Sequence, residues 1–156
     1  MKNHYTTEPE DERAVLVTWK EQYATGIKLI DEQHQELVNL TNKLYQACLE
    51  GQEVVETVFK EAMSRMVNYV RFHFNAEQQL LEQIKYPQYL DHKKQHETLV
   101  KDILEAVRDY ETGKKFVPNN FVRTLTDWVF GHIAIYDKRY AEYVAELKKR
   151  GLLTGL

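Results

Sequence analysis

The stretch RFHFNAEQQLLEQIKYPQYLDHKKQH, residues 71–96, decides the fold of this chain. Its candidate metal ligands form two pairs, each with a spacing of four residues: His73 with Glu77, and His92 with His96. Side chains at that spacing project from one face of a helix. The Tyr86-Pro87 step lies almost midway between the pairs and favours a break, since proline disfavours helix in the preceding residue and suits the first turn of a new helix. The stretch therefore predicts two antiparallel helices whose ligand pairs meet at one level.

Length, composition and charge indicate a single globular domain. The chain has 156 residues, of which 43% are hydrophobic and 29% charged, and its net charge of −3 argues against nucleic acid or an anionic membrane as a partner. The single cysteine, Cys48, can form no internal disulfide, which suits a reducing compartment. No apolar run approaches the roughly 20 residues of a membrane span, and the first residues lack the apolar core of a signal peptide. We expect a cytoplasmic, α-helical domain.

Four segments carry apolar residues at the three- and four-residue spacing of helices. We expect the helices at residues 31–51, 53–83, 88–110 and 118–150. Asp31 would be the N-cap of the first helix, and Gly51 would end it. Short connections force antiparallel neighbours, which predicts an all-α, up-down-up-down four-helix bundle. The domain assignment is an N-terminal arm at 1–18, which packs from about Trp19, the bundle at 19–150 and a C-terminal tail at 151–156.

Three more residues of ligand type fall at the level of the two pairs. His34 lies on the first expected helix, and His132 and Asp137 lie on the fourth. The midpoints between these positions and the pairs fall at or near the expected connections, with the first helix the loosest fit. Seven candidate ligands therefore share one level of the bundle: His34, His73, Glu77, His92, His96, His132 and Asp137. His4, in the polar arm, receives no role.

The spacing of His132 and Asp137 conflicts with a regular helix. Five residues at about 100° each place two side chains about 140° apart, although both must reach one site. Either the two side chains converge from two sides, or the helix contains a π-bulge, a feature that is common at functional sites.

The ligand types indicate the metal. Five imidazoles and two carboxylates without a thiolate suit borderline first-row metals, iron among them. Seven groups exceed the needs of one ion, so two ions are expected, and two bridging carboxylates with one bridging oxygen from solvent leave one coordination position open. This set is less anionic than the four-glutamate, two-histidine set of ferritin-like proteins, which favours a dioxygen carrier over an oxygenase.

The chain resembles the hemerythrin family, specifically its bacterial type, the bacteriohemerythrins. The resemblance covers roughly residues 16–145 and includes the run WKEQYATGIKLI at 19–30. It rests on four motifs, which stand here as Gln33-His34, His73-Phe74-Asn75-Ala76-Glu77, His92 to His96, and His132 to Asp137.

The resemblance implies a role for each ligand. His92, His96 and His132 would bind one iron, and His34 and His73 the other, which keeps the open position. Glu77 and Asp137 would bridge the two irons beside an oxo or hydroxo group. The implied function is reversible dioxygen binding for storage, transport or scavenging, without enzymatic activity. The alternatives are an oxygen or redox sensor that acts through a partner protein, and a di-iron oxidase or a peroxide- or nitric-oxide-handling enzyme. A protein recipient of oxygen or of a signal remains unknown.

We also expect a dry, apolar pocket around the metals. Its candidate walls are Leu37, Phe72, Leu99, Ile103 and Trp128. Each ligating histidine should donate its second N–H group to a backbone carbonyl or an acidic group. Tyr140 fits a contact with the ligands and a place in the core equally well. Gln78 is expected to face outward, without effect on the site.

Overall fold

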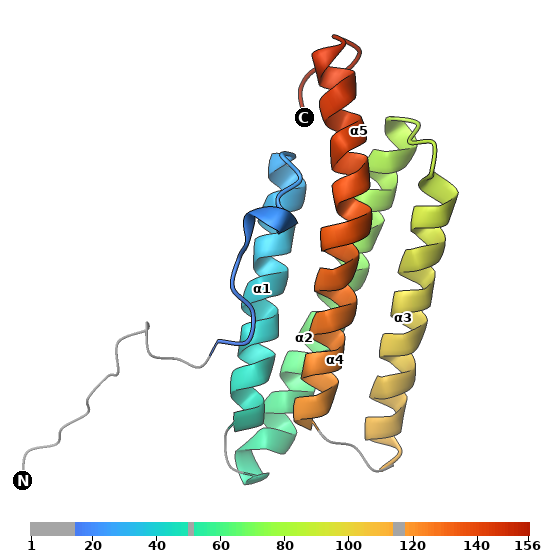
Figure 1. Ribbon diagram of the computed structural model, residues 1–156. Helices are drawn as coiled ribbons and strands as arrows, with labels where there is room; N and C mark the ends of the chain where they lie inside the picture. Colours follow the sequence, from blue (N-terminus) through green and yellow to red (C-terminus); the bar gives the residue numbers. More distant parts are fainter. Residues whose placement is uncertain (1–14, 50–51, 114–117) are drawn as a thin grey trace, which may run out of the picture.

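The computed structural model describes residues 15–49, 52–113 and 118–156, and within these ranges every regular element is a helix. The elements are the 3-10 helix η2 (Glu21–Tyr23), α1 (Lys28–Leu49), α2 (Gln52–Gln83), α3 (Tyr89–Glu111), α4 (Pro118–His132), the π-helical segment η3 (Ile133–Asp137) and α5 (Lys138–Lys149). Figure 1 shows α1, α2 and α3 as three antiparallel rods, with α4, η3 and α5 continuing into one another as the fourth. The predicted all-α, up-down-up-down bundle is confirmed.

The corner between α2 and α3 is where the sequence predicted it. Both helices agree with their predicted bounds to within one residue. The N–H of Tyr86 donates to the carbonyl of Leu81 at 3.0 Å and that of Lys85 to Glu82 at 3.1 Å, while Lys85 has a left-handed φ of 53°. This is a Schellman motif, in which Tyr86 and Leu81 belong to one apolar cluster. Pro87 lies outside both helices, so the left-handed residue, and not proline alone, ends α2.

The start of the first helix was predicted wrongly. α1 begins at Lys28, so Asp31 lies in its first turn and is not the N-cap. The carboxylate of Asp31 accepts hydrogen bonds from the N–H and hydroxyl of Thr25, at 2.7 and 2.8 Å, and from the N–H of Gly26 at 3.1 Å. Asp31 therefore closes the turn before α1, where Gly26 has a φ of 76°. Gly51, the predicted end of this helix, lies outside the described residues.

The described part of the predicted arm packs along α1. The side-chain oxygen of Asn42 accepts hydrogen bonds from the N–H groups of Leu16 and Val17, both at 3.0 Å, and its amide nitrogen donates to the carbonyl of Val17 at 2.9 Å. Val17 is buried in the core. Residues 1–14 of the arm lie outside the described residues, and the predicted tail, 151–156, is non-helical.

Two apolar clusters fill the bundle at different levels. The larger one includes Leu37, Phe59, Met66, Ile103 and Leu125, among others. The smaller one consists of Ile27, Ile30, Leu81, Tyr86, Tyr140 and Val144. Along each helix the seven candidate ligands lie between residues of the two clusters. The core thus has a polar layer between two apolar ones.

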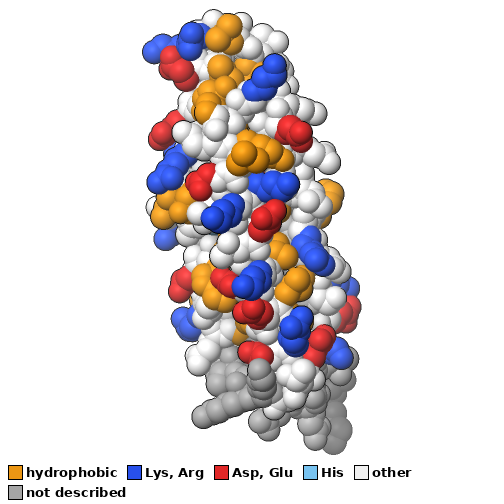
Figure 2. Space-filling model, turned by 90° about the vertical axis from the view of Figure 1, so that its right-hand side faces the viewer, with side chains coloured by type: hydrophobic (Ala, Val, Ile, Leu, Met, Phe, Trp, Pro, Cys, Tyr) orange, Lys and Arg blue, Asp and Glu red, His pale blue; other side chains and the backbone are white. Residues whose placement is uncertain are grey.

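The surface carries mixed charge. Figure 2 shows Lys and Arg side chains interspersed with Asp and Glu along the coloured part of the visible face, with apolar side chains between them. Among the described residues, none of the helices is both long enough and apolar enough to cross a bilayer.

Replacing Lys85 by glycine should stabilise the protein. Lys85 is exposed, so its side chain contributes little packing, whereas its left-handed backbone conformation costs about 1–2 kcal/mol for a residue with a Cβ atom. Glycine removes that cost but loses more entropy on folding, so we expect Lys85→Gly to raise the free energy of unfolding by about 0.5–1 kcal/mol in urea denaturation. Gln83→Gly, at the last residue of α2, is the control and should lower it, because Gln83 keeps a right-handed helical conformation in which glycine is unfavourable. A destabilised Lys85→Gly variant would contradict the motif.

Candidate metal centre

All seven candidate ligands lie together in the polar layer. They come from every rod of the bundle: His34 from α1, His73 and Glu77 from α2, His92 and His96 from α3, His132 from the end of α4, and Asp137 from the end of η3. None is more than 5% exposed. Their donor atoms form two groups, each within 4.8 Å, that share the two carboxylates: Glu77, His92, His96, His132 and Asp137 in one, and His34, His73, Glu77 and Asp137 in the other.

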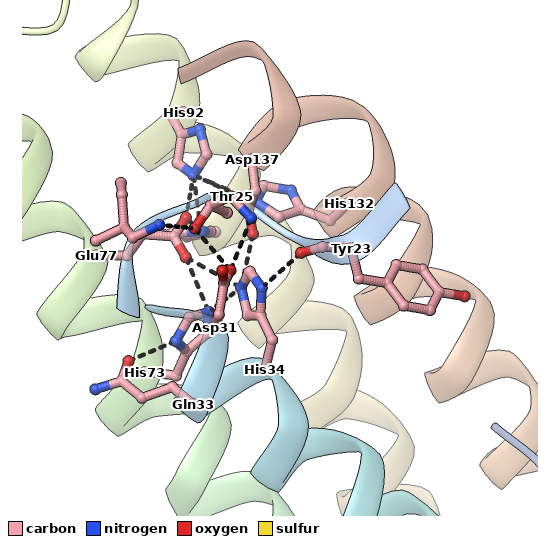
Figure 3. Close-up of polar contacts among 12 residues, drawn as sticks. Tyr23, Thr25, Asp31, Gln33, His34, His73, Glu77, His92, His132 and Asp137 are labelled. Carbon is pink, nitrogen blue, oxygen red and sulfur yellow. Dashed lines mark hydrogen bonds and ion pairs between the residues drawn. The ribbon is translucent and has the colours of Figure 1, made fainter. Parts of the chain in front are cut away.

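The Nε2 atoms of the histidines face one another within each group. Nε2 of His92 lies 3.1 Å from that of His96 and 3.3 Å from that of His132. In the other group, the Nε2 atoms of His34 and His73 are 3.1 Å apart (Figure 3). Nitrogens at such distances aim at a common point, and the convergence leaves Nδ1 of each ring turned away from it.

Each carboxylate offers one oxygen to each group. Oε1 of Glu77 lies 2.7 Å from Nε2 of His92, and its Oε2 lies 2.8 Å from Nε2 of His73. Oδ1 of Asp137 lies 3.2 Å from Nε2 of His92, and its Oδ2 lies 3.2 Å from Nε2 of His34. The two carboxylates therefore have the placement of bridges between two ions.

The polar atoms of this layer fit a metal better than they fit one another. Oε2 of Glu77 and both oxygens of Asp137 are buried and have no hydrogen-bond partner. Their short distances to histidine nitrogens lack the geometry of hydrogen bonds. A buried carboxylate oxygen without a partner costs several kcal/mol, a cost that a coordinated cation removes. Donor set and geometry thus both fit a pair of divalent or trivalent ions.

The His132–Asp137 conflict is resolved by the helix itself. Residues Ile133–Asp137 form a π-helix, which confirms the second of the two alternatives, the π-bulge. The wider turn brings Asp137 to the side of the rod on which His132 lies, so that its Oδ1 is 3.1 Å from Nε2 of His132.

The outward nitrogens of three histidines have protein partners. His34 has its Nδ1 3.3 Å from the carbonyl of Tyr23, as predicted. Nδ1 of His73 lies 2.7 Å from Oε1 of Gln33, which explains the glutamine of the Gln33-His34 motif (Figure 3). That partner is an amide, as is the Gln78 partner of His96, so the predicted acidic group or backbone carbonyl is wrong for both histidines. Such partners fix the orientation of a ligating ring.

Gln78 was predicted wrongly. It is half-buried, and its Nε2 lies 3.1 Å from Nδ1 of His96. The same histidine stacks on Phe74, with ring centroids 3.8 Å apart and an interplanar angle of 1°. The sequence carried a signal for both residues, because Phe74 and Gln78 have the four-residue spacing of His73 and Glu77, shifted by one position.

Four of the five residues predicted as apolar walls are buried or half-buried in the core. Leu37 and Ile103 are fully buried, and Leu99 and Trp128 are partly buried against the same cluster. Phe72 is 57% exposed, because it precedes His73 by one residue and points away from the inner face of α2. Phe74, which is buried against His96, takes the inner position that was expected for Phe72.

The titratable groups balance their charges. Burial alone would lower the pKa of His34, but the carboxylates of Asp137 and Glu77 outweigh it and raise this pKa to about 10. The same balance raises the pKa of His92 to about 9, whereas burial lowers the pKa of His96 to about 4. Burial favours the neutral carboxyls, yet the surrounding histidines hold the pKa values of Glu77 and Asp137 below their ordinary values. Without metal, protonated histidines would therefore offset the charges of the two carboxylates, and metal ions would replace those protons.

Tyr140 contacts the site. Its ring lies 5.4 Å from that of His92, and its fully buried hydroxyl has no hydrogen-bond partner. Burial, together with the charges of Glu77 and Asp137 and the approach of the hydroxyl to the Glu77 carboxylate, raises the pKa of Tyr140 well above its ordinary value, although that approach does not have the geometry of a hydrogen bond. Tyr140 has both of the roles that the sequence left open, because its ring contacts His92 and also belongs to the smaller apolar cluster.

The metal-free protein should lose stability as the pH rises from 7 to 9. Folded His34 and His92 keep their protons up to about pH 10 and 9, whereas in the unfolded chain their pKa is the ordinary 6.5. Their contribution is therefore complete below pH 6.5 and is lost as the pH rises through the folded values, by up to about 1.4 kcal/mol per pH unit for each group. Urea denaturation of chelator-treated protein measures the loss. The metal-loaded protein is the control, and equal stability of the metal-free protein at both pH values would contradict the charge balance.

Removing the hydroxyl of Tyr140 should not destabilise the metal-free protein. An unpaired buried polar group costs about 1–3 kcal/mol, so Tyr140→Phe should keep or raise the free energy of unfolding in urea. Tyr143→Phe, which removes a hydroxyl that donates to the carbonyl of Ile84 at 3.4 Å, is the matched control and should lower it. A loss of more than about 1 kcal/mol in Tyr140→Phe would show that its hydroxyl is bonded to a buried group.

Comparisons with known proteins agree with this geometry. Residues 25–144 match the family model described as the hemerythrin HHE cation binding domain. The chain is 30% identical over 129 residues to a bacteriohemerythrin of Stenotrophomonas maltophilia, covering 83% of this chain and 82% of that protein. It is 25% identical over 126 residues to a bacteriohemerythrin of Methylococcus capsulatus, covering 80% and 94%.

A solved structure shows the same bundle. The crystal structure of wild-type hemerythrin superposes with a TM-score of 0.75 at 25% identity, covering 82% of this chain and 97% of the other. The family model spans most of the chain, and a relative at 30% identity does the same. The chain therefore belongs to the hemerythrin family.

Proposed function

We propose that the seven ligands hold two iron ions and that the chain binds dioxygen reversibly at this centre. The observation that carries the proposal is the sharing of both carboxylates between two groups of histidines. One group contains three imidazoles and the other contains two. If the bridging groups contribute equally to both ions, the ion beside His34 and His73 would have one ligand fewer. Its open coordination position would be the binding site for dioxygen. When bound, the two irons supply the two electrons that dioxygen takes up and returns on release.

The chain's own residues favour reversible binding. Five neutral imidazoles and two carboxylates supply little negative charge, which favours ordinary oxidation states over the higher ones that attack substrates. Leu37 lies one turn after His34 and is fully buried, so it limits the access of water to that side. Gln33 holds the ring of His73 in place from outside the centre. These features support a carrier over an oxidase.

An anaerobic optical spectrum of the reduced, iron-loaded protein tests the proposal. We expect two irons per chain, a visible charge-transfer band that forms in air, and loss of the band under argon. Two irons without a reversible band would remove the carrier and leave the metal centre. Catalytic consumption of peroxide or nitric oxide would favour the enzyme, and a stable complex with a signalling partner would favour the sensor.

Glu77→Gln tests the bridging role separately. The substitution removes one of the two negative charges shared by the groups, so iron content should fall below two per chain and the reversible band should be lost. Glu82→Gln, an exposed carboxylate on the same helix, is the matched control and should retain both. Full iron loading of Glu77→Gln with an unchanged band would contradict the assignment of Glu77.

A further inference from the structure

Two glutamines contact the outward nitrogens of two histidines, one in each group. Gln33 is buried and places its Oε1 2.7 Å from Nδ1 of His73. Gln78 is half-buried and places its Nε2 3.1 Å from Nδ1 of His96. The Gln33 contact is used above to explain the position of His73. The Gln78 contact reaches a histidine of the other group, where it has no role in the proposed dioxygen binding.

The ring nitrogen of His96 that carries the proton determines whether Gln78 donates or accepts the hydrogen bond between them. Nε2 of His96 points into the centre, 3.1 Å from Nε2 of His92 and 3.5 Å from Oε1 of Glu77. A neutral imidazole that coordinates a metal through Nε2 carries its proton on Nδ1 and donates from there. The Gln78 amide donates to Nδ1 in the orientation described, and a 180° turn of the amide brings its oxygen to the same place. An amide can therefore form a hydrogen bond with Nδ1 of His96 with or without metal, as acceptor or as donor, whereas a carboxylate can only accept one.

Phe74 and Gln78 hold His96 together. Both come from α2 and are four residues apart, so they project from one face of that helix. Phe74 stacks flat on the ring and prevents it from tilting out of its plane. Gln78 contacts the edge of the ring and fixes its rotation within that plane. The two contacts together aim Nε2 at the centre.

A groove between α2 and α3 brings solvent to this contact. It has a volume of about 900 Å³, and its lining includes Phe74, Gln78 and His96 together with charged residues of both signs, among them Lys101 and Glu97. A charged side chain at position 78 would therefore be hydrated and would not be buried without a partner. This allows the chemistry of position 78 to be varied without unfolding the bundle.

We propose that Gln78 is a positioning residue of the metal centre, whose amide orients His96 and, as acceptor of its Nδ1–H, sets how strongly this ring donates to the metal. The inference rests on the proposed two-iron centre. It assigns to Gln78 a control over the ion held by His92, His96 and His132, separate from the dioxygen position beside His34 and His73. A stronger acceptor at position 78 makes the imidazole more electron-rich and favours the ferric state of that ion.

Three variants test the role: Gln78→Leu, Gln78→Glu and, as the matched control, Gln79→Leu, which makes the same change at the next, exposed residue. Retention of iron against a competing chelator should fall by about 10–100-fold in Gln78→Leu. It should stay at the wild-type level in Gln78→Glu and Gln79→Leu. The reduction potential should shift upward in Gln78→Leu and downward in Gln78→Glu. A purely structural role would not produce opposite shifts.

The outcomes separate this inference from the proposed function. If the wild-type chain and Gln79→Leu hold two irons, and Gln78→Leu matches them in iron retention and potential, Gln78 has no such role and the dioxygen proposal stands. If Gln78→Glu loses iron as Gln78→Leu does, acceptor strength is not what matters, and the inference is overturned. If the wild-type chain takes up no iron, the proposed function itself fails, and this inference with it.

Discussion

A layer of buried charge between two apolar clusters is the constraint on which the rest of this structure depends. Glu77 and Asp137 are fully buried, with three of their four oxygens lacking hydrogen-bond partners. Such a layer is costly unless cations balance it, and those cations are imidazolium groups or metal ions. Since every rod of the bundle contributes a ligand, the same cations hold the rods together at mid-height. In this 156-residue chain, the contacts between ligands and cations replace apolar packing at the level between the two clusters.

Helix α2 shows how one element can serve two purposes. Its residues at the positions of His73 and Glu77 supply ligands to both groups, while the next face, with Phe74 and Gln78, holds a ligand of α3. A rigid helix positions both faces with little freedom, because their relative angle is fixed by the helical repeat. Orientation of the ligands is thereby built into the backbone and does not depend on mobile loops.

The sequence predicted whatever depends on spacing. The two ligand pairs, the corner near Pro87 and the level of His34 follow from the helical repeat and from short connections. Features that depend on a side-chain angle or on one backbone torsion were not predictable in this way. Lys85 takes a left-handed conformation that usually favours glycine, and Asp31 bonds backward to the preceding turn.

Errors at single residues have the same origin. Phe72 was placed inside and Gln78 outside, yet each differs from a ligand position by only one residue. One residue turns a helix by about 100°, so a side chain at the edge of the buried face can point either way, and only packing against α3 decides. The π-helical segment has a wider effect of this kind. Its extra residue also turns everything that follows, so Tyr140 and Val144 reach the smaller cluster only because η3 precedes them. Deleting one residue there would make the rod regular and rotate α5 away from its partners, so the position of Asp137 and the closure of one end of the bundle depend on the same extra residue.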